Sequence, residues 1–150
     1  MVKPMREMVV GFIIAEGSVL LVEKKRPAWQ AGFLNGVGGK VEPGETPAMA
    51  MERETSEETN IHMRHNWWRL FCTLDVNNPE KSGAVRVHFY VSFCPIMLTA
   101  NQVEDEPLGW YDLTDIPHLH VIDNLKWLIP LATAELPAKV TGKEERRTDG

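Results

Sequence analysis

Hydrophobic and β-branched side chains gather along this chain in short runs that are separated by polar turns. The runs predict strands at Met8–Ala15, Val19–Glu23, Trp67–Asp75, Ala84–Cys94 and Leu108–Asp112. Glu16-Gly17 lies between the first two runs, so we expect these to form a β-hairpin. The polar segment Val76–Gly83 is rich in turn residues and predicts a connection between the third and fourth strands.

Two segments carry signals of helices instead. Thr46-Pro47 is typical of an N-cap followed by proline at the first helical position, and Asn60 is a suitable left-handed stop, so we expect a helix over Pro47–Thr59. A second helix is predicted at about 122–134, where Pro130 is expected to bend or break it. Strands, a helix, further strands and a final helix indicate the α+β class.

The composition predicts one domain, which we place at residues 1–138. The chain has 150 residues, of which 43% are hydrophobic and 25% charged, as in an ordinary folded protein. The charged segment Lys139–Gly150 has few large apolar groups and is expected to be a flexible tail.

Charge and hydropathy exclude several classes of partner. A net charge of −5 argues against binding to long nucleic acid, although small nucleotides stay possible because a metal supplies positive charge locally. The apolar run near the N-terminus is short and is followed by Glu16-Gly17, which argues against a signal peptide, and we expect no membrane span. The two cysteines, Cys72 and Cys94, suit a reducing compartment. We therefore expect a cytoplasmic protein; its oligomeric state stays open.

Three carboxylates on the first predicted helix are the strongest candidates for chemistry. Glu54, Glu57 and Glu58 stand at positions i, i+3 and i+4, and therefore on one face. Such a charge run is often only a solvated surface. Here the glycine-rich segment Gly36–Gly39 leads towards the helix, and glycine allows a ligand to approach the backbone closely. Loop and helix together predict a phosphate–metal site, with Mg²⁺ or Mn²⁺ as the hard cation that oxygen ligands prefer.

The same segment resembles the Nudix box, Gly-x5-Glu-x7-Arg-Glu-U-x-Glu-Glu-x-Gly-U, in which U is a bulky aliphatic residue. Its matching residues are Gly39, Glu45, Arg53, Glu54, Glu57, Glu58 and Ile61. The six identical residues have a chance frequency on the order of 10⁻⁷ per starting position. The chain departs from the box at Thr55 and Asn60. We expect Thr55 to bond the carbonyl of Met51, and asparagine is the second choice after glycine for a left-handed helix end.

The resemblance implies a fold and roles for individual residues. The fold is a Nudix-type α/β/α sandwich around a mixed β-sheet. Glu54, Glu57 and Glu58 would bind the metal with the Gly38 carbonyl, and Arg53 would orient Glu54 or Glu57. Glu104, in an acidic loop before Trp110, is a further candidate ligand or base, as an alternative to a solvated loop acid.

Residues outside the box resemble the MutT-like branch, whose members hydrolyse nucleoside triphosphates. Asn35 would read the base edge and Lys40 would contact phosphate, while Asp123 and Asn124 lie where this branch presents polar groups to a purine. Leu34 and Val121 replace tryptophans of that branch, which weakens the case for oxidised purines as substrates.

These observations predict a Mg²⁺-dependent hydrolase of nucleoside diphosphates linked to a further group X. We expect a nucleoside triphosphate to give monophosphate and pyrophosphate, with Glu54, Glu58 or Glu104 as the base. The alternatives are a pyrophosphatase of nucleotide sugars or of dinucleotides such as ADP-ribose and NADH, and a Nudix module that binds nucleotides without catalysis.

Overall fold

A computed structural model describes residues 5–77, 83–134 and 140–145. Its strands are β1 (Arg6–Ala15), β2 (Ser18–Glu23), β3 (Leu34–Asn35), β4 (Val37–Lys40), β5 (Arg69–Asn77), β6 (Ala84–Cys94), β7 (Leu108–Asp112) and β8 (Val140–Glu145). The helices are α1 (Pro47–Thr59) and α2 (Leu125–Thr133), with short 3₁₀ turns η1 (Ala28–Gln30), η2 (His65–Trp67) and η3 (Leu113–His118). Part of the predicted 76–83 connection, residues 78–82, lies outside the described residues.

The strands form one mixed sheet in the order β3-β2-β1-β6-β5-β8, with β4 paired to β1 and β7 to β2. The pairs β1–β6 and β5–β8 are parallel, and the other pairs are antiparallel. This arrangement confirms the predicted α+β class and mixed sheet. No helix in the described ranges is long and apolar enough to cross a membrane.

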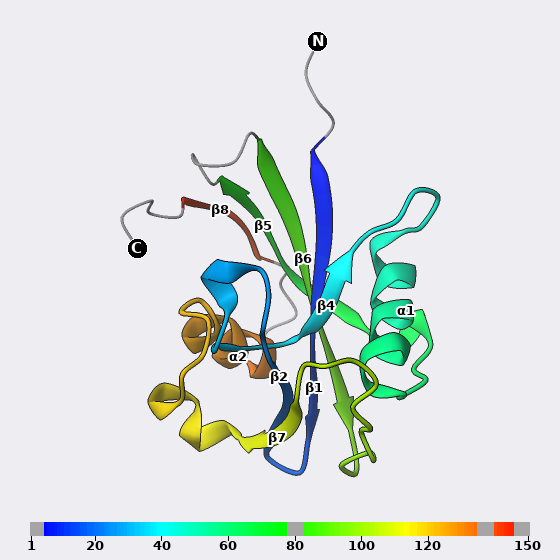
Figure 1. Ribbon diagram of the computed structural model, residues 1–150, viewed down its shortest axis with the longest axis vertical. Coiled ribbons are helices and arrows are strands. Elements are labelled where there is room, and N and C mark those ends of the chain that lie inside the picture. The colour runs from blue at the N-terminus through cyan, green and yellow to red at the C-terminus, as the bar shows by residue number, and fades with distance from the viewer. Residues whose placement is uncertain (1–4, 78–82, 135–139, 146–150) are drawn as a thin grey trace.

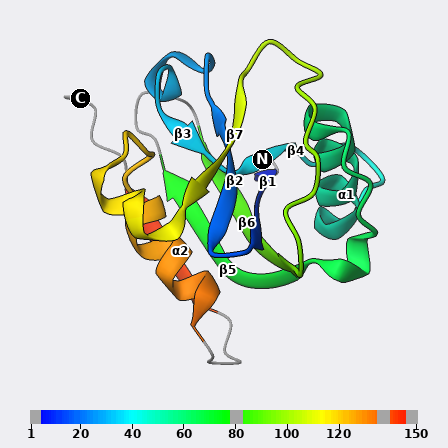
Figure 2. The same ribbon diagram turned by 90° about the horizontal axis from the view of Figure 1, so that it is seen from below.

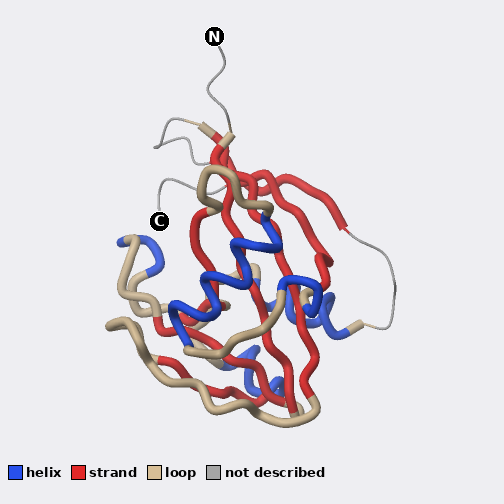
Figure 3. The backbone as a smooth tube through the Cα atoms, turned by 90° about the vertical axis from the view of Figure 1, so that its right-hand side faces the viewer, coloured by secondary structure: helices blue, strands red, loops and turns tan. Residues whose placement is uncertain are grey.

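Helices α1 and α2 cover opposite faces of the sheet (Figures 1 and 2). Residues alternate between the two faces along each strand, so Val9 and Ile13 pack with Met51 of α1, whereas Phe12 and Ile14 pack with Leu128 of α2. Figure 3 shows α1 lying over one face of the sheet. Two hydrophobic cores therefore hold the helices, one on each side.

Helix α1 begins and ends where its sequence predicts. The Thr46 hydroxyl accepts a hydrogen bond from Met49 N at 3.2 Å, and Pro47 occupies the first turn. Asn60 ends the helix in the left-handed region, with φ 58°. The hydroxyl of buried Thr55 donates to the Met51 carbonyl at 2.7 Å, so this departure from the Nudix box is accommodated inside the core.

Two parts of the chain differ from the expectation. Residues 36–40, expected as a glycine-rich loop, contain strand β4, which pairs with β1 from Met8↔Lys40 to Gly11↔Val37. Residues 140–145, expected in a flexible tail, form β8, which runs parallel to β5 from Cys72↔Val140 to Asn77↔Glu145. The segment has few large apolar groups, so only its backbone pairing with β5 identifies it as a strand.

Candidate active site

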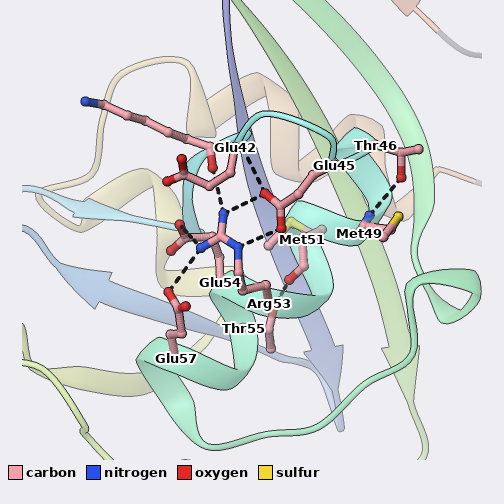
Figure 4. A network of polar contacts seen from close by, with 10 residues as sticks. Glu42, Glu45, Thr46, Met49, Met51, Arg53, Glu54, Thr55 and Glu57 are labelled. Atoms are coloured by element: carbon pink, nitrogen blue, oxygen red, sulfur yellow. Dashed lines mark hydrogen bonds and ion pairs between the residues drawn. The ribbon is translucent and has the colours of Figure 1, made fainter.

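Arg53 lies at the centre of a polar network that joins α1 to the loop before it (Figure 4). Its Nε and Nη2 donate to both oxygens of Glu45 at 2.7 and 2.9 Å, and Nη1 donates to Glu54 at 2.9 Å and to Glu57 at 3.1 Å. Nη2 also donates to the Lys40 carbonyl at 2.9 Å. One guanidinium therefore joins β4, the loop between β4 and α1, and two of the candidate metal ligands. The hydrogen bonds that Arg53 donates to Glu45 are the largest cause of the raised pKa of Arg53.

Glu54 lies between Arg53 and the glycine-rich strand. A Cβ on Gly39 would overlap the Glu54 carboxylate, so glycine at this position is what allows the acid to approach β4. Burial raises the pKa of Glu54, partly offset by the Arg53 hydrogen bond, and the charges of Glu57 and Glu104 raise it further. The effect of Glu104 indicates that the acidic loop before β7 lies close to the carboxylates of α1.

Glu58 is the most deeply buried of the three helix carboxylates. It is 8% exposed, and its Oε2 atom has no hydrogen-bond partner among the residues that the structure describes. Burial raises the pKa of Glu58 to about 8, and the neighbouring Glu54 charge adds to the shift. A buried carboxyl oxygen without a partner is costly unless a cation or a donor meets it. This buried oxygen without a partner fits the divalent metal that the resemblance to the Nudix box implies.

The carboxylates of α1 do not form a preformed metal site in this structure. Within residues 5–77, 83–134 and 140–145, no three His, Cys, Asp or Glu side chains converge closely enough to hold an ion. Arg53 instead pairs with Glu54 and Glu57, whose side chains are 13% and 51% exposed, beside buried Glu58. The side-chain atoms available to bind a metal are all carboxylate oxygens, which suit a hard cation such as Mg²⁺ or Mn²⁺.

A partly buried ion pair, which sequence reasoning missed, links the acidic loop before β7 to the segment that follows β2. Lys24 Nζ lies 3.0 Å from Glu106 Oε1, and Lys25 N donates to Glu106 Oε2 at 2.7 Å. Arg26 and Asp105 add an exposed pair at 2.6 Å. The sequence does contain a basic triplet at 24–26 and an acidic triplet at 104–106, which could have suggested this pairing, but the two lie about 80 residues apart. The charge of exposed Glu104, in the same loop, contributes to the raised pKa values of Glu54 and Glu58.

A cavity of about 500 Å³ lies on the face of the sheet that α2 covers. Three of the four predicted substrate-binding residues line it: Asn35, Lys40 and Asn124. The fourth, Asp123, is exposed and is not part of the lining. The floor is apolar and includes Phe89. An apolar floor with a few polar groups at its edge is typical of a small-molecule site.

Lys40 lies between the cavity and the network of Arg53 with the α1 carboxylates. It lines the cavity, while its backbone carbonyl accepts the hydrogen bond from Arg53. The neighbouring Gly38 pairs with Val10 of β1, and a Cβ on Gly38 would overlap the backbone of Val9. A ligand seated in the cavity would thus extend past β4 to reach the acids of α1.

Replacing Arg53 by lysine is expected to lower catalytic turnover by about ten- to a hundredfold. A single ammonium cannot reproduce the fork that holds Glu45, Glu54 and Glu57 together with the Lys40 carbonyl. The measurement is the steady-state kcat of the purified variant. Arg64→Lys, at an exposed position beyond the end of α1, is the matched control. Equal kcat values for the two variants would contradict the central role of Arg53 in this network.

Comparison with known proteins gives consistent matches. A model of the NUDIX domain matches residues 5–129. The chain is 40% identical over 94 residues to a CTP pyrophosphohydrolase of Escherichia coli, covering 56% of this chain and 70% of that protein. It is 31% identical over 127 residues to an oxidized purine nucleoside triphosphate hydrolase of Danio rerio, covering 77% and 72%. A MutT protein structure from Bacillus halodurans superposes with a TM-score of 0.76 at 20% identity, over 97% of this chain and 92% of that one.

Proposed function

The chain belongs to the NUDIX domain family, and on this basis we propose that it hydrolyses nucleoside triphosphates to a monophosphate and pyrophosphate. At the coarser level it is a Nudix hydrolase that acts on nucleotide-like substrates. The observation that carries the finer proposal is the position of Lys40 between the cavity and the network of Arg53 with the α1 carboxylates. The names of the two relatives, one a CTP pyrophosphohydrolase and one a hydrolase of oxidized purine triphosphates, favour triphosphates.

Some residues of the chain bind the metal and the nucleotide, and others accept the proton. Mg²⁺ or Mn²⁺, held by Glu54, Glu57, Glu58 and the Gly38 carbonyl, would neutralise charge on the phosphate oxygens and activate the attacking water. The nucleoside enters the cavity, whose wall includes Asn35 and Asn124. Lys40 meets phosphate oxygens at the cavity edge.

Water attacks one phosphorus of the link between the α and β phosphates, the bridging P–O bond breaks so that monophosphate and pyrophosphate separate, and the proton of the water passes to a carboxylate. The charge of Glu104 raises the pKa of both Glu54 and Glu58, and the charge of Glu54 raises that of Glu58. These three acids are the candidates for the base. Arg53 keeps Glu54 and Glu57 on the same side of α1. Glu45 fixes the Arg53 guanidinium and also accepts the Glu42 N–H at 2.8 Å, which holds the loop before the helix.

A panel of nucleotides tests this proposal. The purified chain is incubated with Mg²⁺ and ordinary triphosphates, oxidised purine triphosphates, ADP-ribose or a dinucleoside polyphosphate, and the products are separated. We expect pyrophosphate and monophosphate from at least one triphosphate. Cleavage of ADP-ribose with inert triphosphates would replace the proposal by a dinucleotide pyrophosphatase. If no nucleotide of the panel is cleaved with either Mg²⁺ or Mn²⁺, the result would favour a module that binds nucleotides without catalysis.

A further inference from the structure

A chain of hydrogen bonds in the cavity wall fixes the direction in which one buried amide points. Gly36 N lies 2.8 Å from Asn35 Oδ1, and Asn35 Nδ2 lies 3.1 Å from Gln30 Oε1. A backbone N–H can only donate, so it requires the Asn35 oxygen on its side. The Asn35 amino group must then donate to Gln30, whose oxygen accepts. The free end of this chain is therefore the amino group of Gln30, Nε2.

This amino group belongs to a side chain that lines the cavity. Gln30 is 8% exposed and lines the cavity wall. Its backbone is held at both ends, because Gln30 N donates to Pro27 O and Phe33 N donates to Gln30 O, each at 2.9 Å. Nε2 has no hydrogen-bond partner among the described residues, yet it is not one of the atoms there that are sealed from solvent without a partner. It is thus a fixed donor that a ligand can reach.

The other accessible polar side chains of the wall are donors as well. Arg6, Arg26 and Lys40 carry no acceptor atom, and no carboxylate occurs among the described residues that line the cavity. Asn124 Oδ1 is an acceptor, but it is sealed from solvent. The Asn35 oxygen is already occupied by Gly36 N. The cavity wall therefore complements a ligand rich in acceptor atoms.

We propose that Gln30 is a specificity-determining residue that selects bases bearing a carbonyl oxygen over bases bearing an amino group at the same ring position. This inference rests on the proposed function, because it assumes that the base occupies the cavity. A carbonyl oxygen meeting Nε2 completes the chain that begins at Gly36 N. An amino group at the same place would set two donors against each other, which leaves both without a partner and costs about tenfold or more in binding.

Matched pairs of nucleotides probe this contact. Hypoxanthine and adenine differ at position 6, and uracil and cytosine differ at position 4, in each case as carbonyl against amino group, and the adjacent ring nitrogen changes with it from N–H to bare N. Variants at Gln30 then show which part of the preference comes from the contact with Gln30. Isothermal titration calorimetry gives the Kd of the unmodified chain for dIMP, dAMP, dUMP and dCMP. Monophosphates have no pyrophosphate link to cleave, so the comparison is independent of catalysis. We expect the carbonyl member of at least one pair to bind about tenfold more tightly, with no reversal in the other pair.

Two substitutions at Gln30 test the direction of the amide. Gln30→Glu still accepts from Asn35 but presents an acceptor to the base, so the preference within a pair should be lost or inverted. Gln30→Met removes the polar group and should reduce the preference to about one. Asn66→Asp, the same change of amide to carboxylate at an exposed position near α1, should keep the preference of the unmodified chain. The ratio within a pair cancels any general weakening of phosphate binding by the added charge.

Tighter binding of the amino members, or an unchanged ratio in both Gln30 variants, would overturn the inference. Hydrolysis of the corresponding triphosphates is measured in parallel and reports on the proposed function alone. A chain that prefers the carbonyl monophosphates without cleaving triphosphates would refute the proposed reaction and keep the role of Gln30.

Discussion

The Glu57→Gln variant is expected to lose turnover of nucleoside triphosphates by a factor on the order of 10²–10³, while keeping the stability of the unmodified chain. The change removes one of the three negative charges available to the metal and preserves the size of the side chain. Glu57 is 51% exposed, and its ion pair with Arg53 at 3.1 Å is a surface contact that contributes little to folding. Activity and stability should therefore separate.

The measurement is kcat from pyrophosphate release, together with the thermal unfolding midpoint. Glu52→Gln is a matched control on the same helix, because Glu52 contacts His65 and not the Arg53 cluster. Binding of Mn²⁺, followed by electron paramagnetic resonance, gives a readout independent of turnover and should weaken only in Glu57→Gln. Near-normal kcat in Glu57→Gln would remove Glu57 from the metal site.

The Gly38→Ala variant is expected to lose about 3 kcal/mol of unfolding free energy. A Cβ at this position would overlap the backbone oxygen of Val9 and come within 3.0 Å of Val10 Cα. These are backbone atoms of β1, to which β4 is paired, so no side-chain rotation relieves the overlap. Because β4 connects the cavity with α1, its displacement should also impair activity.

Urea unfolding followed by circular dichroism measures this effect. Gly142→Ala, whose added Cβ would make only an ordinary 3.4 Å contact with Leu74, is the control and should change stability by less than about 0.5 kcal/mol. Gly39→Ala is an informative neighbour, because its Cβ would meet the end of the Glu54 side chain, which can move. It should keep most of the stability and lose activity. A Gly38→Ala midpoint equal to that of the unmodified chain would contradict the close pairing of β4 with β1.

Local signals in the sequence predicted the elements that depend on local chemistry. The Thr46 cap, the Pro47 start and the Asn60 stop are where the residue types require them. The strands Ala84–Cys94 and Leu108–Asp112 were predicted with the observed bounds, since each is an apolar run bordered by turn residues. The spacing of the α1 carboxylates likewise needs only helical periodicity.

Features that depend on pairing between distant segments were not predictable in this way. Strand β4 is rich in glycine, and β8 has few large apolar groups, so only their partners β1 and β5 identify them as strands. The ion pair between Lys24 and Glu106 joins residues whose separation along the chain hides their contact. Gln30 shows no motif, and its orientation follows from the hydrogen bonds that begin at Gly36.

We propose that water cleaves a triphosphate between the α and β phosphates and that this reaction depends on the α1 carboxylates. The most direct measurement is hydrolysis of the best triphosphate in water enriched with ¹⁸O, with Mg²⁺ present, followed by mass spectrometry of all products. We expect monophosphate and pyrophosphate, with one ¹⁸O atom in one of them, and loss of both products in Glu57→Gln. Release of diphosphate and orthophosphate, or equal product from Glu57→Gln, would contradict this proposal.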